Sequence, residues 1–356
     1  MKGSLVYSNR NVLLGLALLH LLGFFFLGIF PHFFSGEEGI LPYTAQGIDM
    51  SKPFKEPSWR FNENFFGTDH LGRDVLAQII YGCRTSLVVC IPAISIATLT
   101  GLLLGLSAGY FGNDGKKIRL HAMLLCGIVL CIGLYYGFYA GQYSLKRAWD
   151  SSFIEGLGVL MWRLCLVSLF SVGTYILVKK SKKGKTCYVP MDELVLKMVE
   201  LFSSVPRLIL ILALAAFLQP SVGVLVLILG LTSWTGMARL SRGEVIRIKA
   251  LPYIEAAKAL GLKDRSIVLY HVLPNILPVV IVAAAFGLAK LLALEATLSF
   301  LGIGLPPDEA SWGKIISNVR HNFSAWWLVV FPGGYLSLTV LALHYCSNYF
   351  LDRYRP

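Results

Sequence analysis

Two ionisable side chains, Lys290 and Glu295, stand inside a long apolar stretch, residues 277–301. A charge inside a membrane span is costly and is by default a functional hypothesis. The two residues are five positions apart, about 140° around a helix, so they are poorly placed to pair with each other. We treat both as candidates for lining a passage. For Lys290 two roles stay open: binding an acidic group such as a carboxylate, or a structural pair with an acid on a neighbouring helix or subunit.

The other reactive residue types form no catalytic or metal-binding pattern. The seven histidines show no His-x₃-His spacing, and the seven cysteines contain no Cys-x-x-Cys pair and lie mostly in apolar runs. No Ser/His/Asp set can be assigned, so we predict no catalytic residue and no metal site. The chain also lacks a G-x-x-x-x-G-K-[ST] loop, so we expect it to bind no cofactor or nucleotide itself.

Residues 252–261 predict a short, isolated helix in a polar segment. Pro252 suits the first helical position, and Gly261 suits the left-handed residue that ends a helix. About nine residues are too few to be stable alone in water, so this helix must dock against something. The alanines among them leave a thin surface that allows close approach of another protein. The alternative is an amphipathic helix lying on a membrane surface.

Composition places these elements in a lipid bilayer. The chain has 356 residues, of which 56% are apolar and 15% charged, and its mean hydropathy is +0.65. A soluble domain carries about a quarter charged residues. Runs of about twenty apolar residues predict eight spans, and the fold class is an all-α polytopic membrane protein. The predicted spans are 11–30, 86–109, 120–142, 154–178, 194–218, 221–238, 277–301 and 326–350.

The positive charges predict the orientation. Lys and Arg concentrate in alternate connections, which is the positive-inside pattern and places both termini in the cytoplasm. The formal charge of +12 therefore needs no nucleic-acid partner. Residues 31–85 are then mostly external, and residues 239–275 form the long internal loop.

That loop resembles the "EAA" loop of ABC importer permeases. The match is Glu255-Ala256-Ala257-x-x-x-Gly261, followed after nine residues by His271-Val272-Leu273-Pro274-Asn275. The generic pattern has an aliphatic residue in place of His271. A histidine followed by Leu-Pro-Asn resembles the dipeptide/oligopeptide/nickel branch of the family.

A second stretch supports the same resemblance. Gly67-Thr68-Asp69-His70-Leu71-Gly72-Arg73-Asp74 is similar to the G-T-D-x-x-G-R-D segment of the "C"-type permease subunit of dipeptide importers. Three shorter stretches also match in order, so the likeness runs from about residue 60 to the C-terminus with one interruption. These stretches are 109–112, 295–302 and 311–313.

The resemblance implies a type I-like ABC importer fold and a set of partners. In that family two permease subunits pair in the cell membrane, each rests on an ATPase subunit, and an extracytoplasmic solute-binding protein delivers the cargo. ATP and Mg²⁺ belong to the ATPases. Residue by residue, Glu255 would contact the ATPase, Ala256 and Ala257 would allow a close fit, and Gly261, before Leu262, would make the turn.

The external segment has two interpretations. Asp69, Asp74 and the two glycines are what a capped, sharply turned loop requires whatever its function. Alternatively, the segment that includes Thr68 and Arg73 contacts the solute-binding protein or shapes the outer gate.

The chain departs from the family pattern at residues 113–190, where an inserted hairpin with two extra spans is predicted. We expect it to pack on the lipid-facing periphery, the alternative being contact with an accessory protein. Arg163 in its second span should face protein. The predicted parts are 1–85 (anchor helix and external loop), 86–112 (first core helix), 113–190 (inserted hairpin) and 191–356 (remaining core).

The sequence therefore predicts a permease subunit of an ABC importer for di- or oligopeptides, itself not an enzyme. One alternative is the same machinery importing nickel or another small solute. Another is a secondary transporter, which would need intramembrane acids and broken helices in matching halves of the chain. Arg207 after Pro206 is a weaker passage candidate, because the proline break could let its guanidinium reach freed carbonyls.

Overall fold

The computed structural model describes residues 2–34, 47–58, 64–113, 117–119, 158–159, 161–162, 186–188 and 190–354. The chain divides into two compact units, considered separately here: residues 1–110 with 196–356, and Phe111–Val195. The second unit overlaps the predicted insert 113–190.

The first unit is built from helices, which confirms the all-α polytopic prediction. Its long helices are α1 (Lys2–Ile29), α3 (Val75–Phe111), α9 (Val222–Lys249), α12 (Leu273–Phe300) and α14 (Trp327–Tyr354). Shorter helices are α2 (Pro31–Phe34), α7 (Met191–Ser204), α8 (Arg207–Ala216), α10 (Pro252–Ala259), α11 (Asp264–Ile267) and α13 (Trp312–Ser317). A π-helical turn covers Val268–Val272 and a 3₁₀ turn covers Asn318–His321.

Five described segments are long and apolar enough to cross a membrane: Val12–Ile29, Val75–Phe111, Val222–Lys249, Asp264–Phe300 and Trp327–Asp352. The predicted span 194–218 is interrupted at Pro206, where the sequence also indicated a break. Helices α7 and α8 meet there at a bend of 78°, and the pair counts at most as one broken span. Pro206 precedes α8 and has no N–H to continue a helix. The predicted spans 120–142 and 154–178, with Arg163, lie outside the described residues apart from a few isolated positions.

Three helix boundaries differ from the prediction. Helix α3 begins at Val75 rather than near residue 86, and α9 continues to Lys249 instead of ending at 238. Proline normally interrupts a helix, so Pro274 and Pro278 predict a helix end, but the helix runs on through both into α12. Proline at the start of a helix costs little, and other groups can satisfy a carbonyl freed inside a span. The π-helical turn Val268–Val272 lies directly before the two prolines.

A row of glycines lets α3 and α9 approach closely. A Cβ atom on Gly101 would lie 2.7 Å from the carbonyl oxygen of Trp234, and one on Gly105 would lie 2.6 Å from that of Ala238. Gly109 continues the row towards the end of α3. Small residues at every fourth position are a common way to pack helices in membranes. Helices α3 and α9 therefore pack with their backbones in close contact.

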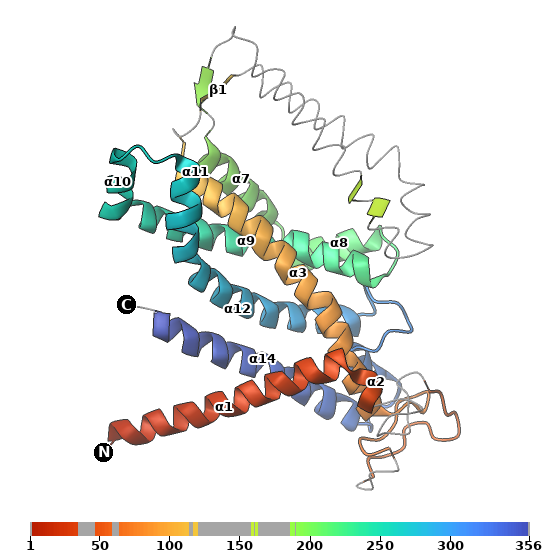
Figure 1. Cartoon of the computed structure of the whole chain (residues 1–356). Coiled ribbons are helices and arrows are strands. Elements are labelled where there is room, and N and C mark those ends of the chain that lie inside the picture. The colour runs from red at the N-terminus through yellow and green to blue at the C-terminus, as the bar shows by residue number, and fades with distance from the viewer. Residues whose placement is uncertain are drawn as a thin grey trace. The chain divides into compact units, whose positions relative to one another are not determined.

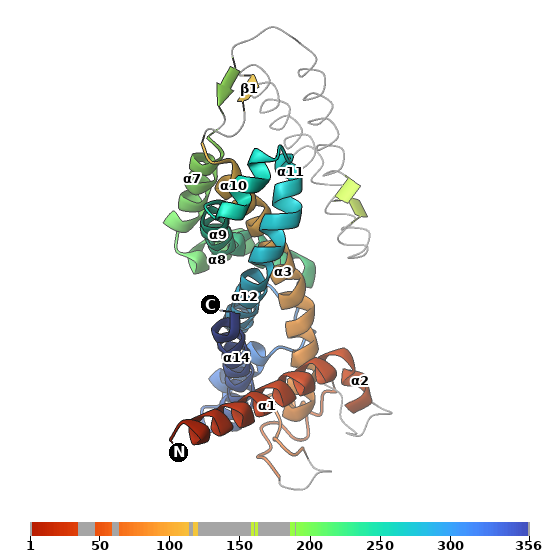
Figure 2. The same cartoon turned by 60° about the vertical axis from the view of Figure 1, so that its left-hand side comes forward.

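The chain ends of the first unit lie on one side of it. Helix α1 packs against α14, and α14 packs against α12 (Figure 2). The beginning of α1, the end of α14 and helix α10 are found together at the left of Figure 1, and the loops around residues 47–74 and 301–326 lie at the other side.

The second unit contains the only β-strands in the described part of the chain. Strand β1 (Lys117–Arg119) pairs antiparallel with β2 (Thr186–Tyr188), and Lys117 is opposite Tyr188. This ribbon was not predicted. Its pairing brings the two ends of the inserted segment together.

Candidate functional site

Helix α10 presents part of the predicted coupling motif to solvent. It begins with Pro252 at its first position, as predicted, and covers eight residues. Ile254 and Ala257 are buried, so they hold the helix to its own chain. Glu255 and Ala256 are exposed on the other face. Ala256 is thus free for a close fit with another surface, whereas Ala257 is used in packing inside the chain.

The turn after α10 has the predicted geometry. Gly261 has φ +75°, in the left-handed region that favours glycine. The N–H of Gly261 donates to the carbonyl of Lys258 at 2.9 Å, and that of Leu262 to Ala257 at 3.2 Å. Leu260, just before the turn, is 81% exposed. An apolar side chain that exposed at a helix end is available for contact with another molecule.

Tyr110, at the end of α3, contacts residues of α9, α10 and α11. Its hydroxyl donates to Asp264 Oδ1 at 2.8 Å, and Lys249 Nζ donates to the carbonyl of Tyr110 at 2.8 Å. The ammonium of Lys258 lies 5.9 Å from the ring centre, within range of a cation–π contact. Asp264 is a residue type that favours helix N-caps, but Lys263 is the N-cap residue of α11 and Asp264 binds Tyr110 instead.

The second half of the EAA-like motif also contacts α10. The amide of Asn275 donates to the hydroxyl of Tyr253 at 3.2 Å, and the Tyr253 and His271 rings lie 6.4 Å apart. Helix α10 is therefore tied to α3 through Tyr110 and to α12 through Asn275.

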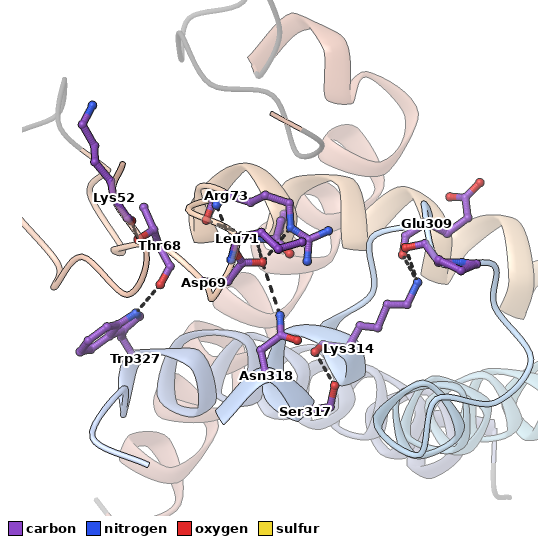
Figure 3. A network of polar contacts seen from close by, with 12 residues as sticks. Lys52, Thr68, Asp69, Leu71, Arg73, Glu309, Lys314, Ser317, Asn318 and Trp327 are labelled. Carbon is purple, nitrogen blue, oxygen red and sulfur yellow. Dashed lines mark hydrogen bonds and ion pairs between the residues drawn. The ribbon is translucent and has the colours of Figure 1, made fainter. Parts of the chain in front are cut away.

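The external motif forms a buried polar network centred on Asp69, which is 0% exposed. Its Oδ1 accepts from the backbone N–H groups of Leu71 and Arg73, both at 2.9 Å. Its Oδ2 accepts from Arg73 Nε at 2.8 Å, from Gln78 at 3.2 Å and from Asn318 at 3.4 Å. Figure 3 shows Asn318 reaching this carboxylate from the segment that follows α13.

The remaining residues of the motif build the same loop. The Thr68 hydroxyl donates to the carbonyl of Lys52 at 2.6 Å, and the Trp327 indole donates to the carbonyl of Thr68 at 3.1 Å (Figure 3). Gly67 and Gly72 have φ values of +78° and +72°. This is the capped, sharply turned loop expected from the residue types. Contact with a solute-binding protein stays a prediction.

Asp74 closes the motif and starts α3. Its Oδ1 accepts from the N–H of Ala77 at 2.7 Å, an N-cap interaction, and its Oδ2 accepts from Asn64 at 3.2 Å. Burial disfavours the charged form and raises the pKa of Asp74 to about 6, although these hydrogen bonds act in the opposite direction.

Glu295 belongs to a second buried cluster rather than to a passage. It is 0% exposed, and its carboxylate accepts from the hydroxyls of Ser311 at 2.8 Å, Ser299 at 2.9 Å and Ser86 at 3.3 Å. Trp312, next to Ser311, donates to the carbonyl of Ile79 at 3.0 Å. Two family-like stretches, 295–302 and 311–313, thus meet Ser86 of α3 here. Their residues hold α3, α12 and α13 together.

Lys290 has a different setting. It is exposed on α12 and lines a cavity of about 580 Å³ between the middle parts of α3, α9 and α12. Arg207, at the start of α8, lines the same cavity and donates to the hydroxyl of Ser233 rather than to a carbonyl freed by the Pro206 break. Glu295 is not among the residues that line it. The structure therefore brings together Lys290 and Arg207, and separates both from Glu295.

Within the described part of the chain, no group of three or more His, Cys, Asp or Glu side chains could hold a metal ion. The sequence indicated no contact role for Tyr110 or Ser233. Tyr110 lies at the end of a long span, and no sequence pattern connects it with Asp264, 154 positions away.

Residues 189–355 match the family described as the inner membrane component of binding-protein-dependent transport systems. The chain is 25% identical to the oligopeptide transport system permease protein OppC of Haemophilus influenzae, over 98% of this chain and 86% of the relative. It is also 25% identical to the dipeptide transport system permease protein DppC of Bacillus subtilis, over 98% of this chain and 83% of the relative. OppC of Salmonella typhimurium is 30% identical over 47% of this chain and 55% of the relative.

Residues 189–355 belong to this family of inner membrane components, and the whole chain resembles the peptide permeases among its relatives. The chain is a membrane-spanning permease subunit, as the sequence resemblance indicated.

Proposed function

We propose that this chain forms one half of the translocation path of an ATP-driven peptide importer. The relatives named above carry the words oligopeptide and dipeptide in their names, which supports peptides over nickel as cargo. The partners in this proposal are a second permease subunit, two ATPase subunits that bind ATP and Mg²⁺, and an extracytoplasmic solute-binding protein.

Both termini and α10 lie in the cytoplasm in this arrangement. The positive-inside pattern supports it, and so does the position of α10 on the same side as the ends of α1 and α14 (Figure 1). The external motif then faces the solute-binding protein.

One observation carries the proposal: α10 is a short helix with an exposed outer face and a fixed inner face. Glu255, Ala256 and Leu260 are exposed, whereas Ile254 is fully buried. An eight-residue helix gains its stability from packing rather than from its own hydrogen bonds. Docking of the outer face on an ATPase would move the inner face, and Tyr110 and Asn275 would carry that movement to α3 and α12. ATP binding then shifts the population between membrane arrangements.

The test uses the complete complex in proteoliposomes. The solute-binding protein is supplied on the membrane side that carries the 67–74 motif, and ATP on the side that carries α10. Glu255→Lys reverses an exposed charge on the outer face, and we expect ATP-dependent peptide uptake to fall at least tenfold while the permease inserts and assembles normally. Combining it with Gly261→Val, which strains the turn at φ +75°, should abolish uptake. Glu200→Lys, which makes the same charge reversal at an exposed position of α7, is the control.

Undiminished uptake by the double variant would exclude α10 as the coupling element. Uptake by the purified chain alone, without ATPases, would instead identify a secondary transporter.

A further inference from the structure

The cavity lined by Lys290 and Arg207 carries two positive side chains and, among the described residues that line it, no acid. Its walls come from the middle parts of candidate spans, where an unpaired charge is costly. A carboxylate is the usual partner for such a charge. The nearest acid along α12, Glu295, is already bound by three serine hydroxyls and lies outside the cavity.

Several donors at this cavity have no acceptor. The Nε atom of Arg207 and the hydroxyl of Thr98 are buried and make no hydrogen bond with the described residues. The Lys290 ammonium makes no hydrogen bond or ion pair with the described residues either. Buried polar groups are normally paired, so donors left open in one cavity call for an acceptor from outside the chain.

The Arg207 side chain is nevertheless held in position. One terminal nitrogen donates to the Ser233 hydroxyl, which in turn donates to the carbonyl of Leu229 in α9. A guanidinium fixed at one nitrogen and open at Nε presents a donor in a defined direction. Arginine commonly binds a carboxylate with two of its N–H groups, and a guanidinium that is already held in place is well suited to this.

We propose that Arg207 and Lys290 form an anion subsite in the translocation path that binds the carboxylate of the transported peptide. This inference rests on the proposed function, and it adds the recognised group and the residues that recognise it. The subsite selects solutes with a carboxylate over uncharged analogues of the same size. The carboxylate is either the C-terminus of the peptide or an acidic side chain, and the chemistry of recognition is the same.

The first test is a competition assay with the complete complex in proteoliposomes. Trialanine, trialanine amide and the amide of Ala-Glu-Ala are supplied together, and the ratios of imported peptides are measured by mass spectrometry. In Arg207→Gln and Lys290→Gln we expect the acid-to-amide ratio to fall about tenfold. Any preference of the solute-binding protein is the same in all variants and cancels. If the unsubstituted complex imports both trialanine and Ala-Glu-Ala amide in preference to trialanine amide, the subsite accepts any carboxylate. If it prefers trialanine alone, the subsite binds the C-terminal carboxylate.

A second test needs only trialanine. Lys290→Cys is treated with an aminoethyl thiosulfonate, which restores a positive side chain, or with an ethyl thiosulfonate of similar size without charge. We expect uptake to recover only after the positive reagent. The unsubstituted complex treated with both reagents controls for the native cysteines.

Three results would overturn the inference: an unchanged ratio in both glutamine variants, equal recovery with both reagents, or loss of assembled complex with normal uptake per remaining complex. The last result would assign Lys290 to a structural pair with an acid of the partner permease. If the unsubstituted complex shows no ATP-dependent uptake, the proposed function itself fails.

Discussion

The external loop 64–78 and helix α10 both carry family-like motifs, but their polar side chains have opposite surroundings. In the external loop, Asp69 and Thr68 are 0% exposed and bind groups of their own chain. In α10, Glu255 is exposed and its side chain makes no hydrogen bond or ion pair within the described part of the chain. The loop motif therefore maintains the fold, and the helix motif is left for a partner.

Asp69→Ala is the strongest test of this contrast. It removes the acceptor for Arg73, Gln78 and Asn318 and leaves the donors of Gln78 and Asn318 buried, which costs about 3–5 kcal/mol of stability. We expect most of the protein to aggregate on size-exclusion chromatography in detergent. Recovery of a monodisperse protein that has lost only uptake would instead assign this loop to partner contact.

Asp74 gives a smaller, pH-dependent effect. Its folded pKa of about 6 is above the ordinary value of 3.8, so the folded state binds the proton more tightly. Stability from this group is then fully present below about pH 4, is lost as pH rises to about 6 and is constant above, a change on the order of 3 kcal/mol.

The measurement compares unfolding temperatures of wild type and Asp74→Asn at pH 4.5 and 7. Asparagine is also a good N-cap but does not titrate there. We expect the wild type to gain stability relative to the variant at the lower pH. A constant difference between the two proteins would show that Asp74 is not desolvated.

The glycine row between these two regions should respond more weakly. Gly105→Leu forces α3 away from α9, because a Cβ there meets the Ala238 carbonyl, and overpacking of this kind costs about 1–3 kcal/mol. Gly243→Ala, on α9 with open space around it, is the matched control and should be neutral or slightly stabilising. Thermal unfolding in detergent reports both. Equal effects would mean that α3 and α9 are not in close contact.

Leu260→Ser should have the smallest effect on the fold and a large effect on coupling. The side chain is 81% exposed, so we expect stability to change by less than about 0.5 kcal/mol. Peptide uptake per ATP hydrolysed should fall, because an apolar contact with the ATPase is lost. Unchanged coupling would show that the end of α10 does not touch the partner.

Local sequence patterns predicted those features that local physics controls. Pro252 and Gly261 correctly delimited α10, because one fixes φ at a helix start and the other tolerates φ +75° at its end. Hydropathy located the membrane-crossing segments but not helix ends. Helix α9 continues to Lys249 with arginines on its surface, since an α-helix does not end where the bilayer does.

Long-range packing decided the rest. Glu295 and Lys290 look alike in the sequence, as charges in one apolar span, yet one is enclosed by three serines and the other opens into a cavity with Arg207. Two of the three serines that bind Glu295 lie 16 and 209 positions away, so the sequence around Glu295 does not show them.

The sequence by itself determined that this chain crosses a membrane, ends a short helix at Gly261 and carries the motifs of an importer permease. Bilayer solvation and backbone geometry depend on residues that are neighbours in the sequence, so their effects can be predicted from the sequence. Only the tertiary structure decided that the external motif is buried, that Tyr110 anchors α10, and that Arg207 and Lys290 share a cavity. Burial and pairing are properties of side chains brought together from distant segments.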